Sequence, residues 1–304
     1  EIAATLDESL GETNLANFAN GEIHCKFGQS LRGTDVFIIQ SHAESEGMSL
    51  NDSLMEQLIM IDAARRASAK RIIAVCPFYG YARQDRKAEG REPITAKLVA
   101  DLLSTAAANR LVSIDLHSGQ IQGFFHGPVD HLTARPVLVD AMRRLGDDLV
   151  IVSPDAGRVK VAEQYANELA ADLAIVHKRR VKGLKNSVVA QDVVGEVEGR
   201  VCVLVDDMID TAGTMCAAAD QLMAHGASEI HAATTHAVLS GPAVDRIKNS
   251  AIQRLIATNT LPLPSEKDFD KLEVHSVAPI IAKAIDAVFE DTSVSEIFGG
   301  KNQS

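Results

Sequence analysis

The stretch Val201–Thr214 constrains the fold of this chain most, because it indicates a strand, a small polar turn and the start of a helix. Its first five residues are apolar, which is long enough for a buried parallel strand and too short for an independent helix. Asp206 and Asp207 are predicted to end the strand. After the turn, Met215–His225 reads as a helix that Gly226 closes.

This arrangement suits a ligand that carries an anionic group. A helix that begins directly after a strand and a small turn leaves backbone N–H groups free to bind an anion. Thr211 and Thr214 add hydroxyl donors, and Gly213 lets a phosphate approach the backbone closely. The paired aspartates suit sugar hydroxyls or the waters around a divalent cation. The same residues also fit an ordinary strand-to-helix turn with a threonine N-cap, and the pattern alone leaves both interpretations open.

A basic loop follows the predicted strand Arg71–Phe78. Arg83, Arg86 and Lys87 fall within five residues there, beside two tyrosines. Basic loops at strand ends are the usual place for phosphate recognition in α/β proteins, and aromatic rings nearby could stack on a base. A solvated charge cluster is the alternative interpretation.

Two further strand ends carry side chains that are able to bind a metal. His117 follows the apolar run 111–116, and Asp155 follows the apolar run 149–152 in the same way. A lone histidine is more often structural, so its place at a strand end is what raises His117 above the other histidines of the chain.

A second basic cluster, HKRR at 177–180, stands before a polar segment at 181–190. A cationic arm of this kind could close over phosphates and neutralise charge in a transition state. An exposed basic loop is the alternative reading. At 18–22 an Asn-Gly turn predicts a hairpin.

The length of the chain, 304 residues, accommodates two domains. Strands and helices alternate in both halves, which predicts an α/β protein with two similar doubly wound domains and mainly parallel sheets. The expected N-terminal domain is 1–133 and the C-terminal domain 134–287, with the tail 288–304 packing back on the first.

The charge balance argues against some functions. The 41 acidic residues outnumber 30 Lys and Arg, which disfavours broad binding to nucleic acid or membrane surfaces. No apolar run approaches the roughly 18 residues that a transmembrane helix requires. Residues 1–10 read as a helix, not a signal segment, and a short strand is expected upstream. The four cysteines lack CxxC spacing and indicate reduced thiols in a cytoplasmic protein: Cys25, Cys76, Cys202 and Cys216.

The chain as a whole resembles one family, the ribose-phosphate diphosphokinases, or PRPP synthetases, of the phosphate-activated and ADP-inhibited class. The stretch Val201–Thr214 is similar to the PRPP motif of the type I phosphoribosyltransferase fold, which is therefore expected in both domains. The resembling stretches run in order along the chain: FANGE (18–22), RASAKRI (66–72), PFYGYARQDRK (77–87), REPITAKL (91–98), DLHSGQIQGFF (115–125), IVSPDAGR (151–158), HKRR (177–180), VDDMIDTAGT (205–214) and VLSGPAVDRI (238–247).

The resemblance implies transfer of the β,γ-diphosphoryl group of ATP to O1 of ribose 5-phosphate, which gives PRPP and AMP. PRPP is a precursor in purine, pyrimidine, NAD, histidine and tryptophan synthesis. Mg²⁺ is the implied cofactor, because the triphosphate of ATP and the phosphorylated sugar must meet without repulsion. The resemblance also implies a homo-oligomer, a hexamer, with ADP and inorganic phosphate as effectors.

Motif by motif, the resemblance assigns roles to residues of this sequence. ATP would be bound by Phe18, Asn20, Gly21, Glu22, Arg83, Gln84 and Asp85. The metal would be bound by His117 and Asp155. Charge on the transferred group would be stabilised by the catalytic Lys178 and Arg180. Ribose 5-phosphate would be bound by Asp206, Asp207, Asp210, Thr211, Ala212, Gly213 and Thr214. A regulatory site would contain Ser30, Arg32, Ser293, Ser295 and Phe298.

The sequence departs from the family pattern at a few positions. Asn20 stands where an aspartate is common, which keeps a hydrogen-bonding group and removes a charge. Glu89 and Gly90 stand where a serine–arginine pair is frequent in the regulatory site. Two other functions are compatible with the fold: a phosphoribosyltransferase that consumes PRPP, and a non-catalytic regulatory homologue. Arg83, Gln84, His117 and the basic cluster at 177–180 favour the synthetase over the transferase. The intact Lys178 and Arg180 and the unbroken DTAGT loop favour it over the non-catalytic homologue.

Overall fold

The computed structural model describes residues 1–45, 47–180 and 189–300. Its contacts divide the chain into two units. The first comprises 1–133, 260–262 and the described residues from 277 onward, and the second comprises the described part of 134–259 together with 263–276.

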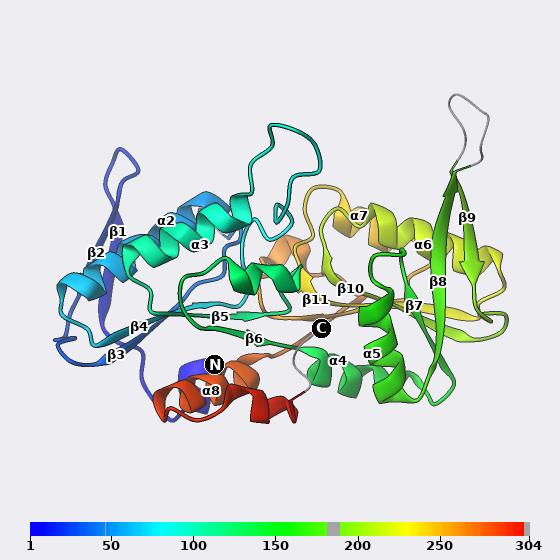
Figure 1. The fold of residues 1–304 in the computed structure, drawn as a ribbon. Helices are drawn as coiled ribbons and strands as arrows, with labels where there is room; N and C mark the ends of the chain where they lie inside the picture. Colours follow the sequence, from blue (N-terminus) through cyan, green and yellow to red (C-terminus); the bar gives the residue numbers. More distant parts are fainter. Residues whose placement is uncertain (46, 181–188, 301–304) are drawn as a thin grey trace. The chain divides into compact units, whose positions relative to one another are not determined.

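The first unit is built on a four-stranded, fully parallel sheet in the order β3-β4-β5-β6. Two helices cover one face of this sheet and α8 lies on the other (Figure 1). An antiparallel hairpin of two strands stands apart from the sheet. The elements are α1 (Ile2–Thr5), β1 (Thr13–Asn17), β2 (Ile23–Phe27), β3 (Asp35–Ile39), α2 (Leu50–Arg66), β4 (Arg71–Cys76), α3 (Thr95–Ala106), β5 (Arg110–Ile114), η1 (Gly119–Gly123), β6 (Val129–Leu132), α8 (Ala278–Phe289) and η4 (Val294–Phe298).

The helix α2 shows how local sequence sets these elements. Ser49 and Asp52 form a capping box, in which the Ser49 hydroxyl accepts from the Asp52 N–H at 3.2 Å and the Asp52 carboxylate accepts from the Ser49 N–H at 2.9 Å. Leu54 and Ile61 lie on the buried face of the helix, against Leu111 and other residues of the sheet.

The second unit contains a seven-stranded sheet in the order β13-β12-β11-β10-β7-β8-β9. Every pair of neighbours is parallel except β8 and β9. The elements are α4 (Arg135–Met142), η2 (Arg143–Leu145), β7 (Leu149–Ser153), α5 (Val159–Leu169), β8 (Asp172–Arg180), β9 (Val189–Val194), β10 (Val201–Ile209), α6 (Gly213–Ala224), β11 (Glu229–Ala237), α7 (Ala243–Lys248), β12 (Arg254–Thr258), η3 (Ser265–Lys267) and β13 (Leu272–His275).

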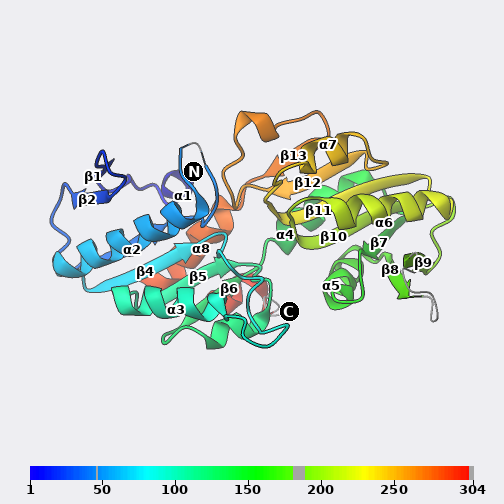
Figure 2. The ribbon, with the colours of Figure 1, turned by 90° about the horizontal axis from the view of Figure 1, so that it is seen from above.

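Helices cover both faces of this second sheet, with α6 and α7 on one side and α4 and α5 on the other (Figure 1, Figure 2). The central strand β10 is therefore buried on both faces. Cys202 and Leu204 pack into the core beneath α6, whereas Val203 and Val205 pack into the core beneath α4 and α5. This is why the strand begins with an unbroken apolar run instead of an alternating one.

The prediction of an α/β protein with mainly parallel sheets is confirmed. The expected second domain ran to 287, whereas the chain leaves the second unit after 276. The difference arises because α8 packs against α1 and its C-terminal end binds Arg71 of β4, all in the first unit.

Three expected boundaries were wrong. The strand β10 does not end at Asp206 and Asp207, because its pairing with β11 continues to Ile209. The helix expected over 1–10 ends at Thr5, and Asp7 takes the left-handed conformation at φ 55°. The strand expected over Arg71–Phe78 ends at Cys76. Several elements, among them β6, α5, α7 and β13, were not predicted.

No helix in the described part of the chain is long and apolar enough to span a membrane.

Candidate active site

The end of β10 holds two adjacent carboxylates against one guanidinium. Arg158 Nε lies 3.2 Å from Asp206 Oδ1, and Arg158 Nη2 lies 2.6 Å from Asp207 Oδ1. The Asp207 backbone N–H also donates to Asp206 Oδ1 at 2.8 Å. Only 18% of the Asp206 side chain and 8% of the Asp207 side chain are exposed. The two carboxylates therefore share a nearly dry position, and Arg158 opposes their charge.

Burial raises the pKa of Asp206 to about 8, the adjacent Asp207 carboxylate adds to the rise, and the charge of Arg158 opposes it. A pair of carboxylates in this state gains from a ligand that donates hydrogen bonds or brings positive charge. Sugar hydroxyls and hydrated cations are ligands of that kind.

The loop after β10 presents the start of α6. Its N-cap is Ala212, which is left-handed at φ 59°, and no described side chain caps the helix. The alternative interpretation of this stretch, an ordinary turn with a threonine N-cap, is therefore not what the described residues of α6 show. Arg246 Nη1 donates to the Thr211 carbonyl at 2.9 Å, and the Ser240 N–H donates to the Asp210 carbonyl at 3.0 Å. These two bonds fix the loop through its carbonyl groups. The backbone N–H groups at the start of α6 therefore suit an anion.

The loop after β7 fixes Asp155. The Ser153 hydroxyl donates to the Asp155 carbonyl at 2.6 Å, and the Gly157 N–H donates to Asp155 Oδ1 at 2.7 Å. This ordered carboxylate fits Mg²⁺, which commonly binds one or two carboxylates and completes its shell with water and phosphate oxygens.

His117 follows β5 in the first unit, after Asp115, which is left-handed at φ 39°. The Leu116 N–H donates to the buried His131 Nε2 at 2.9 Å, and this bond orients the strand end. Imidazole suits softer metals better than Mg²⁺. In the part of the chain that the structure describes, no three His, Cys, Asp or Glu side chains gather as a metal cage.

The basic loop after β4 rests on a buried neutral network around His42. The Gly80 N–H donates to His42 Nδ1 at 3.1 Å, so the proton of the neutral ring is on Nε2, which lies 2.8 Å from Gln57 Oε1. Gln57 in turn donates to the Ile38 carbonyl at 3.1 Å. Burial lowers the pKa of His42 to about 4. A Cβ at Gly80 would lie 2.7 Å from the His42 Cβ, so only glycine fits there.

The predicted nucleotide-binding residues of this loop lie beyond that network. Arg83 and Gln84 are exposed, and Gln84 Oε1 accepts from the Thr95 hydroxyl at 2.5 Å. Asp85 Oδ2 accepts from Gln120 Nε2 at 2.7 Å. The loop backbone is therefore fixed while its cationic side chains stay accessible.

The predicted hairpin turn at 18–22 joins β1 to β2. Phe18 is 57% exposed and meets His24 edge to face at 5.8 Å. Asn20 Oδ1 accepts from the Glu22 N–H at 3.2 Å, and Gly21 takes φ 89°. Asn20 thus shapes the turn with the same acceptor that an aspartate would use.

The side chains of the predicted catalytic pair lie outside what the structure describes. Lys178 and Arg180 belong to β8, but their side chains and the segment 181–188 are not among the described residues.

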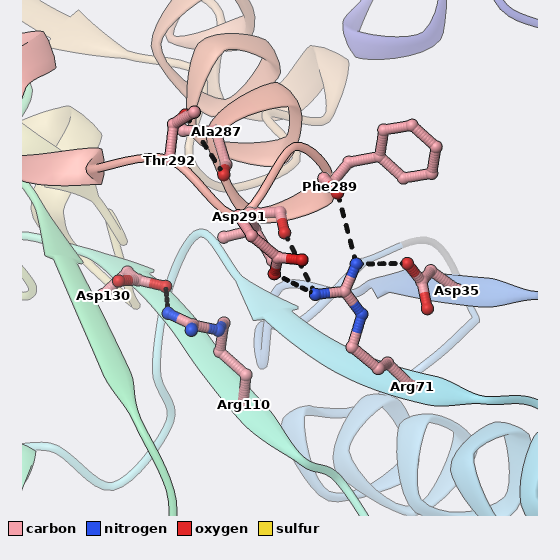
Figure 3. Close-up of polar contacts among 9 residues, drawn as sticks. Asp35, Arg71, Arg110, Asp130, Ala287, Phe289, Asp291 and Thr292 are labelled. Carbon is pink, nitrogen blue, oxygen red and sulfur yellow. Dashed lines mark hydrogen bonds and ion pairs between the residues drawn. The ribbon is translucent and has the colours of Figure 1, made fainter.

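The predicted regulatory residues of the C-terminal tail follow an anchored segment. Arg71 of β4 binds Asp35 and Asp291 and donates to the carbonyls of Val288 at 3.3 Å and Phe289 at 3.2 Å, as Figure 3 shows for all but Val288. Ser293, Ser295 and Phe298 follow in and before η4, and Ser30 and Arg32 lie exposed between β2 and β3.

Arg158, His42 and Arg246 were not assigned a role from the sequence. Arg158 stood within the IVSPDAGR stretch but had no partner to identify it. His42 was one of the histidines left unassigned. In each case the partner comes from an element distant in sequence, so no local pattern could reveal the contact.

A mainly parallel α/β fold, with paired acidic residues before a small-residue loop that opens a helix, belongs to the class of α/β proteins whose loops at strand ends suit phosphorylated ligands. Comparison with known proteins specifies the family. Residues 1–107 match the model of the N-terminal domain of ribose phosphate pyrophosphokinase, and 182–299 match the phosphoribosyl synthetase-associated domain.

Relatives extend the match over nearly the whole chain. The ribose-phosphate pyrophosphokinase of Streptomyces coelicolor is 55% identical over 98% of this chain and 91% of its own length. That of Bifidobacterium longum is 52% identical over 98% and 89%. The crystal structure of phosphoribosylpyrophosphate synthetase from Mycobacterium smegmatis is 50% identical, covers 95% of this chain and 94% of its own, and superposes with a TM-score of 0.89. The chain belongs to the ribose-phosphate pyrophosphokinase family and is an enzyme of that family.

Proposed function

We propose that this chain transfers the β,γ-diphosphoryl group of ATP to O1 of ribose 5-phosphate, with AMP and PRPP as products. One observation carries the proposal within the family: on β10 and the loop after it, a buried acidic pair is followed by an uncapped helix start. The acidic pair suits the ribose hydroxyls, and the helix start suits the 5-phosphate.

Ribose 5-phosphate is proposed to bind with its phosphate on the backbone of 211–214 and its hydroxyls on Asp206 and Asp207. Asp210 leads into the same loop, which the bonds from Ser240 and Arg246 hold in place. O1 of the sugar would then be oriented by contacts at both ends of the molecule, which lowers the entropic cost of the reaction.

ATP is proposed to bind the exposed Arg83 and Gln84, with Asp85 and the hairpin residues Phe18, Asn20, Gly21 and Glu22 contributing. The guanidinium would pair with a phosphate, and the aromatic ring of Phe18 would stack on the base. The network under Gly80 supports this role, since it holds the loop without using the cationic side chains.

Lys178 and Arg180 are proposed to stabilise the charge that develops on the diphosphoryl group. Asp155, with His117 as a second candidate, would hold Mg²⁺. When bound, Mg²⁺ supplies charge neutralisation for the polyphosphates. We further propose a cytoplasmic homo-oligomer, a hexamer, that responds to ADP and inorganic phosphate through Ser30, Arg32, Ser293, Ser295 and Phe298.

The direct test incubates the purified protein with Mg²⁺, ATP and ribose 5-phosphate and follows AMP and PRPP together. We expect equimolar AMP and PRPP, formed only when the sugar phosphate is present, with free ribose as the control. No AMP with any pentose phosphate would contradict the proposal and favour the non-catalytic homologue. Consumption of PRPP with a nucleobase, without AMP formation from ATP and ribose 5-phosphate, would favour the transferase.

A further inference from the structure

Arg158 occupies an unusual place for a cationic side chain. It is the N-cap residue of α5, and no described side chain caps that helix. The N-terminal end of a helix carries partial positive charge, so a cation there is disfavoured, and N-caps are normally short polar side chains that accept hydrogen bonds. Arg158 is therefore not explained by helix capping or by the helix dipole, and its contacts outside the helix are what distinguish it.

Those contacts are directed at the acidic pair of β10. Two nitrogens of one guanidinium reach two carboxylates, Nε to Asp206 and Nη2 to Asp207. The Arg158 side chain is only 16% exposed. Nε and Nη2 lie on one edge of a rigid planar group, so the contact fixes the separation and tilt of the two carboxylates as well as opposing their charge. One positive charge against two negative ones leaves the pair anionic when both carboxylates are ionised.

The same residue ends the loop that carries Asp155. Asp155 is held by bonds within its own loop, to Ser153 and Gly157. Arg158 is the point at which this loop binds the neighbouring strand, since β7 and β10 are adjacent in the sheet. A guanidinium at this position therefore fixes the carboxylate proposed for the metal relative to the carboxylates proposed for the ribose.

We propose that Arg158 is a positioning residue for sugar-phosphate binding, which aligns Asp206 and Asp207 and ties the Asp155 loop to them. This inference rests on the proposed function. It concerns the sugar half of the reaction, because both of its partners belong to the acidic pair that is proposed to bind the ribose hydroxyls.

The test compares Arg158→Ala, Arg158→Gln and Arg158→Lys with wild type in the full-length enzyme. We expect Arg158→Ala to raise KM for ribose 5-phosphate about 10- to 100-fold, the range seen when groups that orient metal ligands are removed. KM for ATP should change less than about threefold. Lysine restores charge but not the two-nitrogen edge, so Arg158→Lys should recover only part of the loss.

Arg143→Ala is the matched control. Arg143 is also in the second unit and also pairs with an aspartate, Asp140 at 2.8 Å, but its side chain is 57% exposed. The Arg143→Ala variant should leave KM for ribose 5-phosphate and KM for ATP unchanged. Thermal unfolding of every variant shows whether a change reflects loss of fold, and if Arg158→Ala does not fold, the glutamine and lysine variants decide.

A double-mutant cycle with Asp206→Asn supplies a readout that a merely structural role would not move. If Arg158 acts through Asp206, the two substitutions together should cost much less than the product of their separate effects. Fully multiplicative effects, equal rises in both KM values, or an unchanged KM for ribose 5-phosphate would each overturn the proposal. Calorimetric binding of ribose 5-phosphate is measured alongside, so an inactive wild-type protein that still binds the sugar would count against the proposed reaction and not against Arg158.

Discussion

The loops after β10 and β4 both join a buried parallel strand to a helix, but different chemistry holds them in place. At the end of β10 the groups held in place are charged: the carboxylates of Asp206 and Asp207, which lie on the strand, share the guanidinium of Arg158. After β4 the fixed elements are neutral, with Gly80 bound to a His42 ring whose pKa is lowered to about 4. The first arrangement gathers acidic groups that we propose for the ribose hydroxyls, and the second lies beside the exposed Arg83 that we propose for the phosphates of ATP. One architecture thus supplies two sites of opposite charge.

The largest expected effect comes from a side chain that belongs to neither loop. Lys178→Ala should lower kcat by roughly a thousandfold or more with little change in stability, because its charge acts mainly in the transition state. Steady-state turnover and thermal unfolding check this. Lys160→Ala, an exposed lysine of α5, is the control, and wild-type turnover in Lys178→Ala would remove this residue from the mechanism.

Next in size is the acidic pair at the end of β10. Asp206→Asn should weaken ribose 5-phosphate binding by about 10- to 100-fold, since a carboxyl oxygen that accepts hydrogen bonds is lost from a buried pair. The same variant should be more stable than wild type near pH 8. The pKa of Asp206 is raised in the folded state, so the folded protein holds a proton that the unfolded chain releases, and wild-type stability falls as pH rises from about 4 to 8.

Thermal unfolding across that pH range, with calorimetric binding of ribose 5-phosphate, separates the two effects. If Asp206→Asn is less stable than wild type at pH 8, ionised Asp206 does not destabilise the folded protein. The predicted difference between the acidic pair of β10 and the neutral network after β4 would then be wrong.

The neutral loop should respond to acid in the opposite direction. The pKa of His42 is lowered by burial, so between about pH 6.5 and 4 the unfolded chain binds a proton that the folded protein does not. Wild-type stability should therefore fall with decreasing pH across that window, by up to about 3 kcal/mol.

His42→Asn removes the group that binds this proton in the unfolded chain, while it keeps an acceptor for the Gly80 N–H. It should flatten the acid limb of the stability curve and raise KM for ATP a fewfold, with KM for ribose 5-phosphate unchanged. Denaturant unfolding at a series of pH values is the measurement, and an undiminished acid limb would exclude His42 as its source.

The smallest effect is expected at the hairpin turn. Asn20→Asp retains the oxygen that accepts from the Glu22 N–H, so the turn should be unchanged. KM for ATP should shift by less than about threefold, the scale of one exposed charge. Asn20→Ala, which lacks the acceptor, is the comparison, and a large effect of the aspartate would mean that charge matters more there than turn shape.

Apolar patterns within short stretches of sequence predicted the strands and helices whose limits those stretches determine. The apolar runs of β4, β7 and β10, with helix-like stretches between them, predicted the alternation of strands and helices, and with it the parallel α/β class. The end of β10 was misplaced because Asp206 and Asp207 look like a terminus, whereas pairing with β11 carries the strand on to Ile209. Short elements such as α7 and β13 have too few residues for a clear period.

The site shows the same division. The loop at 210–214 could be proposed as a binding site because its chemistry lies within one stretch of sequence. Arg158 and His42 could not be proposed, because their partners lie in elements distant in sequence. Composition, spacing and resemblance suggest candidate ligand-binding residues more readily than the residues that hold those candidates in place.

The most direct measurement is a crystal structure of the protein with ribose 5-phosphate and a non-hydrolysable ATP analogue in the presence of Mg²⁺. The account predicts the 5-phosphate on the backbone of 211–214, sugar hydroxyls on Asp206 and Asp207, and nucleotide phosphates beside Arg83. A sugar phosphate bound at the loop after β4, with the loop after β10 empty, would contradict it.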